Sequence, residues 1–180
     1  MVDDEDDRSL LERWRAGDPV AGERLFNRHE RPLTRFFLNK VGHHTVDLVQ
    51  HTMSACLCGG DRLRDDSSVR TYLFQTAREV LYEHLRRHRD GPFDPQEVAL
   101  AELGPIPSTA YAEDLQQRTL LEALQRIPLE DQITLELYFM EGLRGPELAV
   151  VLDVPEAAVP RRIRVGRDRL RALIETPEGA

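Results

Sequence analysis

The sequence lacks the features of several classes of protein. It has no apolar run near the ~20 residues that cross a bilayer, and it begins with acidic residues rather than with a signal peptide. We therefore expect a soluble, cytoplasmic protein that does not bind a membrane. With only two cysteines, Cys56 and Cys58, in 180 residues, the chain has no disulfide framework, and both thiols should be reduced.

Lysine and strand-like patterns are also scarce. Of the 24 basic residues, 23 are arginine, and Lys40 is the single lysine. Alternation of apolar and polar residues, which is typical of strands, is nearly absent, whereas apolar residues recur at spacings of three and four. The fold class that this predicts is all-α. No nucleophile elbow, phosphate-binding glycine loop or paired-carboxylate pattern occurs, so we expect neither an enzyme nor a cofactor.

The net charge of -8 argues at first against nucleic acid as a partner. The charge is segregated, however: residues 1–30 and 91–117 carry -4 and -5, while residues 31–90 carry +3. Residues 161–171 hold six arginines and one aspartate. Because only local charge meets a phosphate, the two arginine-rich segments remain candidates for DNA binding.

Capping residues predict four helices in the first half of the chain. Ser9 is expected to cap a helix that Gly17 closes, and Asp18 a second helix that runs to Val41. Pro32 lies inside this second helix and should kink it or break it in two. Further helices are expected over residues 45–58, and over residues 69–89 after a cap at Ser68.

The composition changes between the two halves. Residues 91–112 contain six glycines and prolines and no basic residue, which is typical of a linker. Apolar periodicity then predicts helices over 115–127, 129–140, 146–152 and 155–174. We expect two helical domains, at 1–90 and 113–176, joined by a flexible acidic linker at 91–112.

Residues 145–174 have the spacing of a helix-turn-helix. Ala149 occupies the crossing point of the two helices, Asp153 the turn position that adopts a left-handed backbone, and Val159 the following core position. The second helix would offer arginines to a DNA groove, although a packed helical hairpin with a solvated basic face has the same spacing. Pro160 should kink this helix, or the regular helix starts later; either puts the reach of the first arginines in question.

Three stretches resemble the extracytoplasmic-function (ECF) group of bacterial RNA polymerase sigma factors. The stretches DLVQHT (47–52) and SSVRTYLFQTAREVLYEHLRRHR (67–89) are similar to region two of that family. The stretch LLEALQRIPLEDQITLELYFMEGLRGPELAVVLDVPEAAV (120–159) is similar to its region four. The resemblance covers residues 8–90 and 115–174. It departs from the family at His51, which replaces an acid, and at Cys56 and Cys58.

The resemblance implies a sigma factor whose partners are core RNA polymerase, promoter DNA and an anti-sigma factor. Core polymerase would contact Asp47, Leu48 and Gln50. Asp47 and Gln50 are three residues apart and share the helix face opposite an expected buried stripe of Val46, Val49 and Met53. The minus-ten element would contact Arg62, Arg64, Ser67, Arg70, Tyr72, Arg78, Arg86 and Arg87, with Tyr72 stacking on a base. The minus-thirty-five element would contact Glu156, Ala158, Arg161, Arg162, Arg164 and Arg167.

Two other functions fit the same residues. One is a helix-turn-helix regulator that binds DNA without polymerase, and the other is a helical adaptor whose arginines meet an acidic protein. A metal site is not expected, although His43, His44, His51 and the two cysteines are ligand types that zinc prefers. Cys56 and Cys58 point about 200° apart on one helix and so do not converge.

Overall fold

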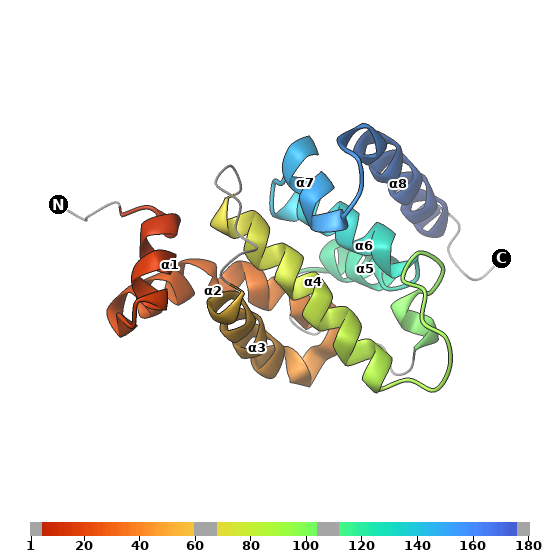
Figure 1. Cartoon of the computed structure of the whole chain (residues 1–180). Coiled ribbons are helices and arrows are strands. Elements are labelled where there is room, and N and C mark those ends of the chain that lie inside the picture. Colours follow the sequence, from red (N-terminus) through yellow and green to blue (C-terminus); the bar gives the residue numbers. More distant parts are fainter. Residues whose placement is uncertain (1–4, 60–67, 104–111, 176–180) are drawn as a thin grey trace.

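The computed structural model describes residues 5–59, 68–103 and 112–175, and these ranges contain helices, turns and one isolated bridge between Ala99 and Pro128. The all-α prediction is confirmed (Figure 1). Within these ranges no helix has both the length and the apolar composition needed to cross a membrane. The principal helices are α1 (Asp7–Arg15), α2 (Pro19–Val41), α3 (Thr45–Cys58), α4 (Val69–Arg87), α5 (Leu115–Leu124), α6 (Leu129–Leu135), α7 (Gly145–Leu152) and α8 (Val159–Glu175).

The helix starts in the first half largely follow the predicted caps. The Asp18 carboxylate accepts hydrogen bonds from the backbone of Val20 and Ala21, and the Ser68 hydroxyl accepts one from Thr71, as expected. The cap of α1 was predicted wrongly, because Asp6 precedes the helix and accepts a hydrogen bond from the Ser9 backbone at 2.9 Å. Ser9 therefore lies within the first turn of α1.

Proline does not break α2. The helix runs without interruption through Pro32 to Val41. Leu25, Leu33 and Phe37, on both sides of the proline, are at most 1% exposed. Burying such side chains contributes about 1.5–3 kcal/mol each, which offsets the ~3 kcal/mol that an internal proline costs.

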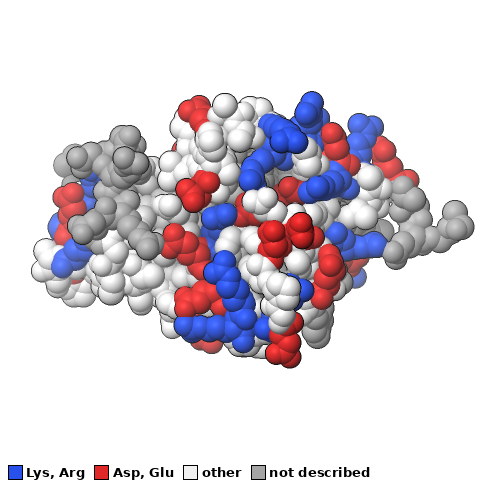
Figure 2. All heavy atoms as spheres, turned by 45° about the vertical axis from the view of Figure 1, so that its right-hand side comes forward, with Lys and Arg blue, Asp and Glu red and all other residues white. Residues whose placement is uncertain are grey.

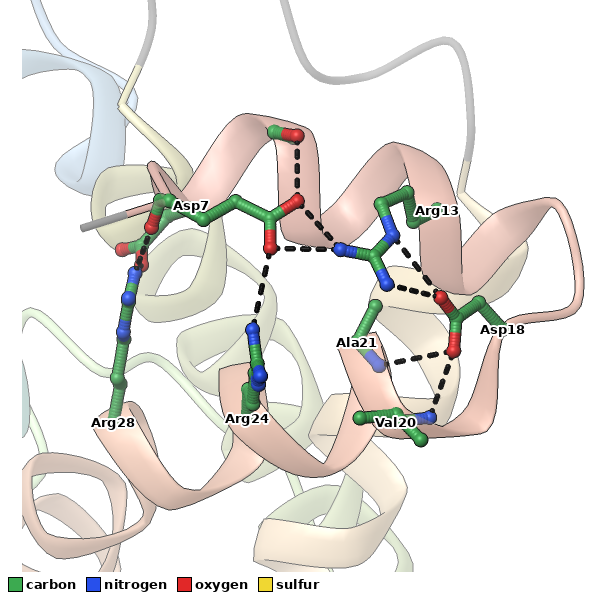
Figure 3. A network of polar contacts seen from close by, with 9 residues as sticks. Asp7, Arg13, Asp18, Val20, Ala21, Arg24 and Arg28 are labelled. Carbon is green, nitrogen blue, oxygen red and sulfur yellow. Dashed lines mark hydrogen bonds and ion pairs between the residues drawn. The ribbon is translucent and has the colours of Figure 1, made fainter. Parts of the chain in front are cut away.

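Ion pairs fasten the short α1 to α2 (Figure 3). Arg13 bridges Glu5 at 2.8 Å and Asp18, while Asp7 accepts hydrogen bonds from Arg28 at 2.9 Å and from the imidazole of His29 at 2.6 Å. Burial alone would raise the pKa of Asp7, but the Arg28 and His29 contacts outweigh it and lower that pKa. Glu5, Asp6 and Asp7 thus belong to the packed structure of α1 and α2.

The second half is built around α6, which packs on α8 where Gly166 allows a close approach. A Cβ at this position would lie 3.3 Å from the Asp131 Cβ and 3.4 Å from the Leu135 Cγ. Residues 136–140 form a π-helical turn (η4, Glu136–Met140) that continues α6. A small apolar cluster of Leu121, Leu124, Ile127 and Leu135 holds α5 against these helices.

The two halves share one apolar core. The larger cluster of buried residues joins Phe36, Leu73 and Phe74 of the first half to Ile133 and Leu148 of the second. Figure 1 shows α4 lying between α3 on one side and α6 and α7 on the other. The two predicted domains therefore pack on each other in this structure; their independent movement stays a prediction.

The described part of the predicted linker is also held in place. The backbone N–H of Leu129 donates to the Val98 carbonyl at 2.9 Å, and that of Ala101 donates to the Gln125 carbonyl at 2.9 Å. Leu100 is 4% exposed in the main core. This half of the acidic segment belongs to the packed structure, which differs from a freely extended linker.

Candidate nucleic-acid interface

Helix α3 presents a polar face with one large apolar side chain. Asp47 and Gln50 are exposed, as predicted, but Val46 is 65% exposed and Leu48 is 7% exposed. The buried stripe of α3 is Thr45, Leu48, Val49, Thr52, Met53 and Cys56. The predicted stripe was therefore wrong at Val46, and the predicted contact residue Leu48 lies in the core, because Leu48 shares the face of Thr45 and Thr52.

A groove lies beside Gln50, between α1, α2 and α3. It has a volume of about 430 Å³ and is lined by Trp14, Phe26, Gln50, Met53 and Ser54, among others. Gln50 thus lies at the border between a polar helix surface and an apolar groove formed by α1, α2 and α3. Such a border suits a protein partner that presents both kinds of side chain.

The residues predicted to bind the minus-ten element fall into three groups: those outside the described residues, those that are buried or half-buried, and those that are exposed. Arg62, Arg64 and Ser67 lie outside the described residues. Tyr72 is 2% exposed, and its hydroxyl donates to the Gly59 carbonyl at 2.9 Å, so here it is a core residue rather than the predicted base-stacking one. Arg86 and Arg87 are exposed near the C-terminal end of α4, and Arg70 is half-buried.

The predicted turn of the helix-turn-helix has the expected backbone. Asp153, at the end of α7, has φ 55° and ψ 51°, and it is the one non-glycine residue with positive φ in the described part of the chain. Ala149 and Val159 are 9% and 1% exposed. The regular helix α8 starts at Val159, after a 3-10 turn (η5, Glu156–Ala158), which places Pro160 in the first helical turn, where proline displaces no helical hydrogen bond.

Arginines line the outer face of α8. Arg161, Arg164 and Arg167 are exposed, as is Glu156 in the preceding turn, whereas Ala158 and Arg162 are half-buried. Figure 2 shows basic side chains gathered on the upper right, with acidic side chains between them. Of the residues predicted to bind the minus-thirty-five element, three arginines are therefore available to a ligand in this arrangement.

One buried carboxylate contacts an arginine from each of the two predicted DNA-binding sets, the minus-ten set of α4 and the minus-thirty-five set of α8. Glu130, at 2% exposure, accepts a hydrogen bond from Arg78 Nε of α4 at 2.9 Å and one from Arg162 of α8 at 3.2 Å. The Tyr82 hydroxyl donates to the same carboxylate, and burial together with Glu130 raises the pKa of Tyr82. In this structure Arg78 and Arg162 thus bind a carboxylate of the protein itself. No pattern in the sequence could have identified Glu130 as their partner.

Two further carboxylates of η4 and its C-terminal end hold bases of α2. The buried Lys40 ammonium pairs with Glu136, and Arg35 donates two hydrogen bonds of 3.0 Å to Glu141. Burial lowers the pKa of Lys40, while Glu136 opposes that shift. Asn39 donates to Glu136 at 3.2 Å and accepts a bond from Gln125 at 2.7 Å. The contact between the halves is therefore strongly polar as well as apolar.

The cysteines and histidines form no convergent ligand set among the described residues. Burial raises the pKa of the Cys56 thiol to about 11, whereas Cys58 is exposed. Four imidazoles instead stack near the C-terminal end of α4, with ring centroids 4.0 to 5.8 Å apart: His43, His44, His84 and His88.

This histidine cluster makes the stability depend on pH. Burial, followed by the neighbouring His88, His44 and His43, lowers the pKa of His84 from 6.5 to about 4. Between pH 6.5 and about 4, the His84 imidazole is protonated more readily in the unfolded chain than in the folded one. The free energy of unfolding is therefore greatest above pH 6.5 and decreases as the pH falls through this range. We expect a lower melting temperature at pH 5 than at pH 7, with a smaller difference in His84→Gln; an equal difference in both proteins would contradict this.

Comparisons with known proteins agree on one family. The Sigma-70 region 2 family model matches residues 25–90, which contain α3 and α4. The ECF RNA polymerase sigma factor SigM of Mycobacterium tuberculosis (strain ATCC 25618 / H37Rv) is 29% identical over 171 residues, covering 93% of this chain and 84% of the relative. RNA polymerase sigma factor NccH of Alcaligenes xylosoxydans xylosoxydans is 27% identical over 186 residues, covering 99% and 100%.

Solved structures share the fold. CnrH in complex with the cytosolic domain of CnrY has a TM-score of 0.69 at 23% identity, covering 94% of this chain and 97% of that one. The sigma factor RpoE of Bartonella quintana, in complex with the anti-sigma factor NepR, has a TM-score of 0.64 at 19% identity, covering 87% and 98%. The region 2 match and the relatives of similar length lead to one conclusion: residues 25–90 match region 2 of the sigma-70 family, and over most of its length the chain is similar to RNA polymerase sigma factors of the ECF group.

Proposed function

We propose that the chain binds core RNA polymerase through the exposed face of α3 and so directs it to promoters. The observation that carries this is the position of Val46, Asp47 and Gln50 together on one exposed helix face, inside the segment that matches sigma-70 region 2. The apolar side chain of this surface is Val46, because Leu48 is buried. A charged, an amide and an apolar side chain on one rigid helix suit a specific protein contact.

Promoter DNA would be held at two places. The segment around residues 60–70 and the exposed Arg86 and Arg87 of α4 would hold the minus-ten element, and the exposed arginines of α8 would enter the major groove of the minus-thirty-five element. Polymerase performs the chemistry, so the chain itself is not an enzyme. Its proposed location is the cytoplasm. Two weak DNA contacts on one chain strengthen each other through effective concentration.

An anti-sigma factor is the proposed regulatory partner. In two solved structures with the same fold, CnrH is bound to the cytosolic domain of CnrY, and the sigma factor RpoE is bound to the anti-sigma factor NepR. The groove beside Gln50, with Trp14, Phe26 and Met53 in its walls, offers such a partner apolar contact area next to the proposed polymerase face.

Copurification separates this function from its two rivals. A tagged chain expressed in bacteria should bring down the polymerase subunits after nuclease treatment. A helix-turn-helix regulator would instead bind duplex DNA specifically without polymerase, and an adaptor would bring down an acidic protein without polymerase. Retention of DNA or of another protein, with polymerase absent, would overturn the proposal.

Reversal of one charge tests the polymerase face. Asp47→Arg should weaken the affinity for core polymerase about tenfold or more, because the charge of an exposed contact residue is inverted. The matched control is Glu30→Arg, which inverts an exposed acid on α2. Affinity is measured by titrating labelled chain with core enzyme. Equal affinities of the two variants would place the contact elsewhere.

A further inference from the structure

Two segments that are far apart in the sequence bring histidines together. His44 ends the short 3-10 turn between α2 and α3 (η1, Gly42–His44), and His84 and His88 lie at the C-terminal end of α4. Measured between ring centroids, His44 is 4.9 Å from His84 and 5.8 Å from His88, and the last two are 4.2 Å apart. Each of the three imidazoles therefore lies close to both of the others, and none of the three is fully buried.

These separations match those of imidazoles that share one metal ion. A histidine nitrogen binds zinc at about 2.0–2.1 Å, which places the centre of each ring about 3.2 Å from the ion. Two rings at the tetrahedral angle then have centroids about 5 Å apart. The three observed separations, from 4.2 to 5.8 Å, lie on both sides of this value. The backbone thus already holds the three rings at the distances that a common ion requires.

A hydrogen bond to the backbone of α4 sets the tautomer of His88. Its Nδ1 lies 2.7 Å from the carbonyl oxygen of His84, and a carbonyl can only accept, so Nδ1 carries the proton. In the neutral ring the free lone pair is then on Nε2. Histidines that bind metals commonly have this arrangement, with the other ring N–H donated to a carbonyl. His84 and His88 are also four residues apart, the spacing at which two histidines on one helix face bind zinc.

We propose that His44, His84 and His88 bind one divalent transition-metal ion such as Zn²⁺, with water as the fourth ligand. Among the described residues the ring nitrogens do not aim at a single point, so binding requires the side chains to turn. Histidine side chains that are exposed or half-buried make such turns quickly. The bound ion fastens the C-terminal end of α4 to the η1 turn, and it binds the folded chain because only folding brings the two segments together.

Calorimetric titration with zinc chloride tests the site on the full chain, with any polyhistidine tag removed. We expect one ion per chain, and an affinity at least about tenfold lower in His84→Gln and in His88→Gln, because even a second-shell partner of zinc contributes 10- to 100-fold. The matched control is His51→Gln, which removes an exposed histidine of α3 outside the cluster. Zinc in about 100-fold excess over its dissociation constant should raise the melting temperature of the natural chain and of His51→Gln by several degrees.

X-ray absorption at the zinc edge identifies the ligands. Zinc lies about 2.0–2.1 Å from nitrogen and about 2.3 Å from sulfur, so the proposal predicts a shell of nitrogen and oxygen alone. A sulfur contribution would place the ion at Cys56 or Cys58, and two chains per ion would make it a bridge between molecules. Either result overturns the proposal, as does no binding at submillimolar zinc or equal affinities of the natural chain and His84→Gln. If His84→Gln does not fold, His44→Gln and the absorption spectrum carry the test.

Discussion

Replacing Lys40 by methionine is expected to lower the free energy of unfolding by about 3–5 kcal/mol, because it leaves Glu136 buried without its partner. The methionine fills a similar volume, so the loss comes from the uncompensated charge rather than from a cavity. Urea unfolding followed by circular dichroism measures the change. This is the largest effect that we expect from a single substitution outside the apolar core.

The second variant of the pair provides the control. Lys40→Met combined with Glu136→Gln removes both charges while an amide still meets Asn39, so most of the lost stability should return. If the single substitution costs less than about 1 kcal/mol, as exposed pairs do, then Lys40 and Glu136 are solvated and the halves are apart in solution.

The second large effect concerns α8. Replacing Arg161, Arg164 and Arg167 together by alanine should reduce promoter-directed transcription about 100-fold or more, since each arginine that reads a base or clamps a phosphate contributes about 1–3 kcal/mol. These side chains are exposed, so the fold should persist. Transcription with core polymerase is measured as full-length transcript per template.

Arg171→Ala is the matched control for this triple variant. Arg171 is an exposed arginine of the same helix, but it pairs with Glu175 at 2.6 Å one turn further on. Its replacement should leave transcription nearly unchanged. Equal losses in the two variants would show that the general charge of α8, rather than its N-terminal arginines, determines promoter binding.

Local signals in the sequence predicted much of the fold. Asp18 with Pro19 marked the start of α2, Ser68 that of α4, and the spacing from Ala149 to Val159 predicted a left-handed residue at Asp153. These features depend on interactions within a few residues, and a single sequence contains them. The cap of α1 failed because Asp6 and Ser9 are both good caps and lie three residues apart.

The contacts between the halves could not be predicted in this way. Lys40 and Glu136 are 96 residues apart in the chain, and Arg78 and Glu130 are 52 apart. No periodicity relates such positions. The same lack of tertiary information explains why Val46 was placed in the buried stripe and Leu48 among the contact residues. Both are apolar, and only the packing of α3 against its neighbours decides which is buried.

The most direct test of the whole account is transcription by core polymerase reconstituted with the purified chain on a genome-wide set of DNA fragments. The account predicts transcripts that start at a small set of shared promoter sequences, that require the chain, and that decrease with Asp47→Arg at the same protein concentration. Reconstituted enzyme that yields no chain-dependent start sites, from core polymerase of demonstrated activity, would contradict it.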